Sequence, residues 1–149
     1  MRRNNVLAGL SLTVGLLQGA LVYASDAKAD VAVIVNTKNP YPWDGDSREQ
    51  VKDLFLGKRD KFPDGTKAKP FDQKQGPVRQ EFYVKLTGKD ESALNVYWSN
   101  LIFTGNGQPP KVVGDDNDVK KMVQENINSI GYIDAKHVDD SIKVVYLVK

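Results

Sequence analysis

The sequence predicts an α/β protein whose mostly parallel sheet carries helices on both faces. Short β-branched apolar runs alternate along the chain with stretches in which apolar residues recur at three- and four-residue intervals. Strands that alternate with amphipathic helices pack as a parallel sheet covered on both sides. The 149 residues contain no Cys, so the core alone must hold the fold together, without disulfides or thiolate zinc sites.

The first 24 residues differ in kind from the rest. Residues 1–5 form a short basic segment, and residues 6–22 form an uncharged, mostly apolar segment. The small residue Ala24 follows after Tyr23. This is the layout of a secretory signal peptide, which we expect to be cleaved after Ala24 or, alternatively, after Ala29. The other interpretation is a membrane anchor, but 17 apolar residues are at the lower limit for spanning a bilayer. We therefore expect a periplasmic protein with no stable membrane anchor after cleavage.

The part of the chain after the signal peptide is near neutral and long enough for one domain. The whole chain has 21 basic and 19 acidic residues, and loss of Arg2 and Arg3 with the signal peptide makes the two counts equal. A near-neutral protein lacks the positive field that a nucleic-acid partner requires, so no nucleic-acid binding is expected. Residues 30–149 can bury a core of their own and are predicted to form a single domain.

The first half of this domain is predicted to hold two strands and a helix. Residues 31–35, all apolar and mostly β-branched, predict a strand buried on both faces. Residues 39–46 contain two prolines and form a loop. Ser47 begins a helix that ends at Gly57 and turns Val51, Leu54 and Phe55 inward. Residues 69–72 predict a weaker strand, because Pro70 cannot donate to a sheet.

The second half is predicted to hold three helices and two strands. Pro77 occupies the favoured first position of a helix that ends at Gly88, Asp90 caps the next, and Asp115 or Asp116 caps the last. Residues 130–133 and 142–148 are strand-like. The inward-facing side chains of the three helices are expected to be Val78, Phe82 and Leu86; Leu94, Tyr97, Trp98, Leu101 and Ile102; and Val119, Met122, Val123 and Ile127.

Two groups of residues are candidates for binding a ligand. Asn36, Thr37 and Asn39 come after the first buried strand, and ligands of open α/β sheets lie beyond strand ends. Gly76 precedes the second helix and Arg79 lies in its first turn, where unpaired N–H groups and a cation favour an anion. The alternatives are that the first group only builds a turn, and that Arg79 is solvated or pairs with Asp72 or Glu81. Lys74 and Gln75 would be accessory donors.

The remaining candidates favour structural roles. Trp43, between Pro42 and Asp44, is the better candidate for an exposed aromatic, and packing on a partner or ligand is one role open to it. His137 is the only His and is expected to be solvated, and the acidic run 115–118 lacks the Gly and distal Glu of a calcium loop. No nucleophile–base pair, P-loop or dinucleotide motif occurs. We therefore expect a protein that is not an enzyme and uses no metal and no cofactor.

Several segments together resemble a known family. They are VAVIVNTKNP (31–40), VKDLFLG (51–57), FPDG (62–65), RQEFY (79–83), YWSNLIFTGNGQPPK (97–111) and IGYI (130–133). This ordered set is similar to the substrate-binding proteins of phosphate ABC transporters, specifically to short members with a single lobe. The resemblance implies one lobe of a type II periplasmic binding protein.

The resemblance implies two possible functions. One is binding of phosphate or another small oxyanion for uptake by an ABC transporter. In the full-length family, two lobes close over the oxyanion, which a loop rich in hydroxyl side chains holds at a helix N-terminus. Residues 71–79 (FDQKQGPVR) stand in place of this loop; they lack Ser and Thr, and Pro77 removes a backbone donor. The second function is therefore a non-enzymatic interaction or scaffold module of the cell envelope that has lost ligand binding.

Overall fold

The computed structural model describes residues 29–43, 45 and 47–149. The predicted signal peptide lies outside the described residues. The elements in chain order are β1 (Val31–Val35), α1 (Ser47–Phe55), β2 (Lys69–Gln73), α2 (Pro77–Thr87), α3 (Glu91–Phe103), β3 (Lys111–Gly114), α4 (Asp116–Glu125), β4 (Ser129–Asp134), a short 3-10 helix (Ala135–His137) and β5 (Lys143–Val148).

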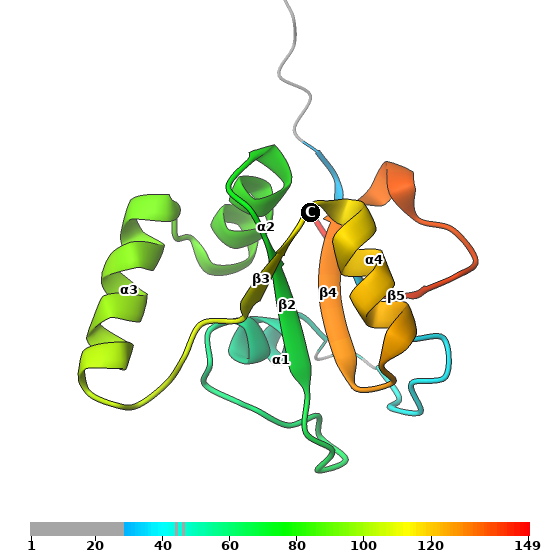
Figure 1. Ribbon diagram of the computed structural model, residues 1–149, viewed down its shortest axis with the longest axis horizontal. Coiled ribbons are helices and arrows are strands. Elements are labelled where there is room, and N and C mark those ends of the chain that lie inside the picture. Colours follow the sequence, from blue (N-terminus) through cyan, green and yellow to red (C-terminus); the bar gives the residue numbers. More distant parts are fainter. Residues whose placement is uncertain (1–28, 44, 46) are drawn as a thin grey trace, which may run out of the picture.

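Five strands form one sheet in the order β3-β2-β4-β1-β5 (Figure 1). β2 is parallel to both β3 and β4, whereas β1 is antiparallel to both β4 and β5. Four strands therefore share one direction and β1 alone opposes them. The predicted α/β class is confirmed. β1 was expected within the parallel part of the sheet. Instead it is antiparallel to β4 and β5, which come last in the chain and lie on either side of it.

The sheet separates two apolar layers, so the prediction of helices on both faces is confirmed. Alternate residues of β1 point to opposite faces and all five are fully buried. α1, α2 and α3 contribute to the layer that contains Val31, Val33 and Val35, while α4 covers the face that contains Ala32 and Ile34. A Cβ added to Gly131 of β4 would come within 2.4 Å of Val119 Cγ1 of α4. This distance shows that the helix lies very close to the strand.

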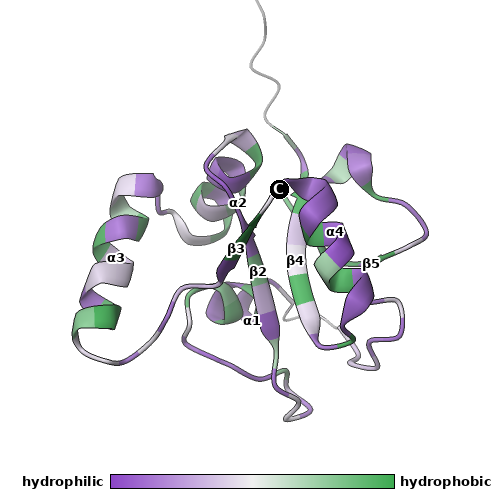
Figure 2. Ribbon diagram, in the orientation of Figure 1, coloured by the Kyte–Doolittle hydropathy of each residue, from purple (hydrophilic) through white to green (hydrophobic). Residues whose placement is uncertain are grey.

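α3 stands to one side of the sheet (Figure 1), and Leu94 and Trp98 are its buried residues. The predicted cap is confirmed, since the Asp90 carboxylate accepts a hydrogen bond from the Ala93 amide at 2.8 Å. Leu94 and Trp98 are buried as expected. The prediction for Ile102 is wrong, because this residue is 56 % exposed at the hydrophobic C-terminal end of the helix (Figure 2).

Three other sequence expectations change. Ile127, which was expected to face inward, is 43 % exposed. Residues 111–114 form the edge strand β3, which the preceding prolines concealed. Trp43 is half-buried rather than exposed, with its ring edge-on to those of Tyr41 and Phe62 at 5.0 and 5.8 Å between centroids. No helix in the described part of the chain is long and apolar enough to cross a bilayer.

Candidate functional site

The two predicted groups of ligand-binding residues lie at opposite ends of the sheet. Because β1 is antiparallel to β4, its last residue, Val35, lies opposite Ile130 at the beginning of β4. Gly76 and Arg79 come after the end of β2, which is parallel to β4 and therefore finishes at the other end of the sheet. The structure therefore does not bring the two groups together into one site.

In the first group, Asn36 and Asn39 are buried and serve the chain itself. The Asn36 amide donates to the carbonyl oxygens of Val123 and Gln124, each at 3.0 Å, and Asn39 donates to the carbonyl of Ile127 at 3.1 Å. Both side-chain oxygens accept backbone N–H groups two residues further on. These contacts tie the loop after β1 to the C-terminal end of α4, so the turn-building alternative accounts for both residues. Thr37 is exposed.

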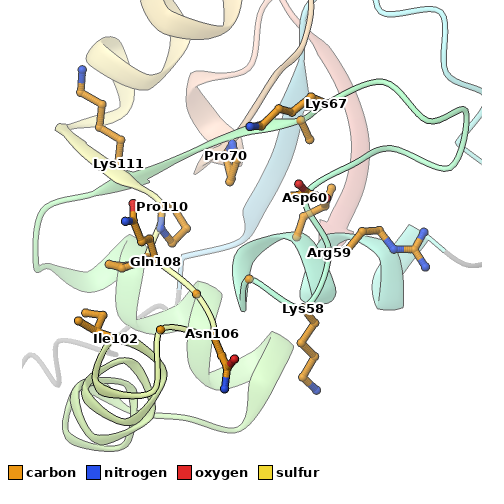
Figure 3. A pocket seen from close by; sticks show the side chains of 16 residues that line it. Lys58, Arg59, Asp60, Lys67, Pro70, Ile102, Asn106, Gln108, Pro110 and Lys111 are labelled. Carbon is orange, nitrogen blue, oxygen red and sulfur yellow. The ribbon is translucent and has the colours of Figure 1, made fainter.

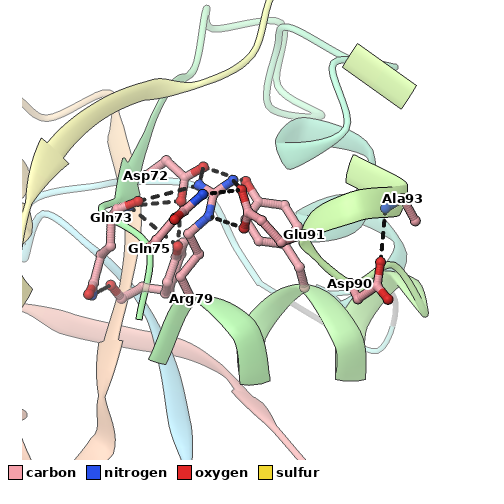
Figure 4. A network of polar contacts seen from close by, with 9 residues as sticks. Asp72, Gln73, Gln75, Arg79, Asp90, Glu91 and Ala93 are labelled. Carbon is pink, nitrogen blue, oxygen red and sulfur yellow. Dashed lines mark hydrogen bonds and ion pairs between the residues drawn. The ribbon is translucent and has the colours of Figure 1, made fainter. Parts of the chain in front are cut away.

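In the second group, Arg79 is buried between two carboxylates (Figure 4). Its Nη1 donates to Asp72 Oδ2 at 2.6 Å, and its Nε and Nη2 donate to the two oxygens of Glu91 at 3.0 and 3.3 Å. A further bond from Nη1 reaches the Gln73 carbonyl at 3.3 Å. The ion pair with Asp72 was one of the alternatives for Arg79, whereas the partner Glu91 lies on the next helix and was not anticipated.

Asp72 is the centre of this network and is 3 % exposed. Besides Arg79, its carboxylate accepts hydrogen bonds from the hydroxyls of Tyr83, at 2.8 Å, and Tyr132. Burial and the neighbouring Asp72 charge raise the pKa of both tyrosines well above the ordinary value. Burial lowers the pKa of Arg79, but Asp72 and Glu91 outweigh this effect and raise it overall. Both carboxylates are therefore well placed to neutralise Arg79.

A second polar chain extends from Gln73 to His137. The Gln73 amide donates to Asp116 Oδ1 at 2.6 Å and to the Tyr132 carbonyl at 2.8 Å. Asp116 Oδ2 accepts from the Asp134 amide at 3.1 Å and lies 2.5 Å from His137 Nδ1. His137 is exposed as expected, with half of its side chain accessible, but it also has a carboxylate partner that the sequence did not indicate. The described residues contain no cluster of side chains that could hold a metal ion.

The surface beside Gly76 is no more favourable to an anion. A cavity of about 350 Å³ separates the beginning of α2 from that of α4. Lys74, Gly76 and Arg79 line one side of this cavity, and Asp115 and Asp118 line the other. Asp115 accepts the backbone N–H groups of Asn117 and Asp118 as the cap of α4, which confirms its predicted role. The two carboxylates oppose the positive potential at the N-terminus of α2.

Comparisons with solved structures confirm the resemblance at the level of the fold. An ABC-type phosphate transport receptor from Vibrio cholerae is 20 % identical with a TM-score of 0.60, over 78 % of this chain and 45 % of the receptor. A phosphate ABC transporter substrate-binding protein from Clostridium perfringens, solved with bound phosphate, is 25 % identical with a TM-score of 0.59. That match covers 78 % of this chain and 44 % of the other protein.

The chain therefore matches less than half the length of either structure, in keeping with the prediction of a single lobe. No protein-family model matches the sequence, and neither does any curated protein. The similarity is one of architecture.

Proposed function

We propose that this chain is a non-enzymatic binding module of the bacterial cell envelope, exported by its signal peptide, that recognises a macromolecular partner. It keeps the fold of one lobe of a phosphate-type receptor without holding a free oxyanion at Arg79. The observation that carries this proposal is the position of Arg79 itself. Arg79 is 9 % exposed and its guanidinium is bonded to both Asp72 and Glu91, so a ligand would have to displace a carboxylate of the chain.

The second candidate is binding of phosphate or another small oxyanion for an ABC transporter. One specific observation favours it, namely that a protein with the same fold was solved with bound phosphate. In this chain, Gly76 and Arg79 would be the contacts, with Lys74 and Gln75 as accessory donors. Glu91, whose side chain is 38 % exposed, is the carboxylate that could most easily swing away to admit an anion.

Thermal unfolding with added anions separates the two candidates. A ligand at about 100 times its Kd raises stability by about 2.7 kcal/mol, which shifts the Tm of a domain of this size by roughly 10 °C. Under our proposal, phosphate and sulfate at millimolar concentration shift the Tm no more than chloride at equal ionic strength. A shift that is specific to phosphate, and that grows in Glu91→Gln, would establish the oxyanion candidate instead.

A further inference from the structure

A cleft in the described part of the chain lies at the opposite end of β2 from Arg79. Its volume is about 670 Å³, within the range of ligand-binding pockets. One wall is the chain between α1 and β2, and the other is the loop that joins α3 to β3 (Figure 3). The residues predicted to bind a ligand do not line this cleft.

The rim of the cleft is strongly basic. Lys58, Arg59, Lys67 and Lys111 line it together with one acidic residue, Asp60. All four basic side chains are exposed, and none forms an ion pair or hydrogen bond with another residue of the described ranges 29–43, 45 and 47–149. In Figure 3 the side chains of Lys58, Arg59 and Lys111 point away from one another around the cleft. The charges are thus spread over a broad surface and do not converge on one point.

The residues that line the cleft include apolar side chains and two residues with backbone amides unpaired in the described chain. Leu54, Ala68 and Pro110 are buried beneath it, and the exposed Ile102 lies at its edge. In the loop, the amide groups of Gly107 and Gln108 have no hydrogen-bond partner among the residues that the structure describes. This loop leads directly into β3, the edge strand of the sheet.

We infer that this cleft binds an extended, acidic polypeptide segment of a partner protein. Diverging cations match carboxylates distributed along a chain better than one compact anion. In an extended peptide, alternate side chains point to opposite sides, so acidic residues can face the basic rim while apolar residues enter the cleft. The free amides at residues 107 and 108 can pair with the peptide backbone. A concave site also suits a peptide better than a flat membrane surface does.

The test uses a short fluorescein-labelled peptide of alternating Glu and Val and measures fluorescence anisotropy. We expect binding to weaken as salt is added, because the charges are exposed. Lys58→Glu combined with Lys111→Glu should raise the Kd at least about tenfold. The matched control, Lys121→Glu with Lys143→Glu, changes the net charge equally at exposed residues of α4 and β5, which do not line the cleft. It should raise the Kd less than about twofold.

Three results would overturn the inference. They are no binding of the peptide, equal losses in the cleft and control variants, or binding to phosphatidylglycerol vesicles that depends on Lys58 and Lys111 while the peptide stays free. The last result would assign the cleft to an anionic membrane surface.

The inference rests on the proposed function, but the inference and the proposed function are contradicted by different results. A phosphate-specific Tm shift contradicts the proposed function, whereas indifference of peptide binding to the cleft variants contradicts only the site.

Discussion

At the carboxyl end of β2, Arg79 lies buried between two carboxylates, whereas at the amino end of the same strand four cations surround an open cleft without an ion pair in the described chain. A buried charge must be compensated within the protein, because its desolvation otherwise costs several kcal/mol. An exposed charge needs no such partner and stays available to a ligand. The comparison therefore directs the search for a binding surface away from the helix N-terminus that the receptor resemblance indicates.

The largest expected effect is the loss of the buried cation. Arg79→Ala should lower the free energy of unfolding by about 3–5 kcal/mol, because Asp72 would remain buried with its charge uncompensated. Chemical denaturation measures this loss, and Arg59→Ala at the cleft is the control, with a change within about 0.5 kcal/mol. From the sequence alone, Arg79 was a candidate anion contact, with solvation or an ion pair with Asp72 or Glu81 as the alternatives. A loss below about 1 kcal/mol for Arg79→Ala would favour the solvated cation.

Trp98→Ala should be the next most damaging change, at about 3 kcal/mol, because it leaves a cavity. Trp98 is 8 % exposed and packs on Gly57, where an added Cβ would lie 3.2 Å from the indole ring. Gly57 lines the cleft, so the same substitution should also weaken binding of the acidic peptide. Denaturation and anisotropy on one sample separate the two effects. Unchanged peptide affinity would show that the cleft does not depend on the attachment of α3.

The comparison also shows what the sequence could predict. The buried strand β1, the caps Asp90 and Asp115 and most of the core come from local patterns, and the structure confirms them. The direction of β1 relative to its neighbours could not be read locally, because it depends on β4 and β5, about 100 residues further along the chain. That direction is what separates Asn36 and Asn39 from Arg79.

Tertiary contacts also decide the individual site residues. Glu91 is 12 residues from Arg79, at the beginning of the next helix, and no sequence spacing suggested the pair. The basic cleft was missed for a similar reason. Lys58 and Lys111 are far apart in the sequence, and each looks like an ordinary surface residue until the fold places them around one cavity.

A double-mutant cycle tests whether Asp72 and Arg79 act as one unit. Asp72→Asn retains an oxygen that can accept the hydroxyls of Tyr83 and Tyr132, and Arg79→Met retains side-chain volume. The double variant should be more stable than the sum of the two single changes predicts, by about 1–3 kcal/mol, because neither charge is left unpaired. Denaturation of all four proteins gives this coupling. Strict additivity would mean that the pair contributes nothing specific.

The pH dependence of stability tests the same network with the native sequence. Tyr83 and Tyr132 have pKa values raised well above 10, first by burial and then by Asp72. Below about pH 10 both states keep these protons, so the tyrosines' contribution is fully present. Above it the unfolded chain loses them first, and stability should fall with rising pH. In Tyr83→Phe combined with Tyr132→Phe this alkaline loss should be smaller; an unchanged slope would assign it to other groups.

The smallest expected effect is the change in the free energy of unfolding when basic residues of the cleft are replaced. Lys58→Ala combined with Lys111→Ala should change the free energy of unfolding by less than about 0.5 kcal/mol, because removal of these side chains leaves no described group without a partner. A slight gain is expected at low ionic strength, since one rim carries four like charges, and added salt should screen it. Denaturation in low and high salt measures both values. A loss above about 1 kcal/mol would show that these lysines stabilise the fold, and the cleft would then resemble the Arg79 end, with its charges committed to the chain itself.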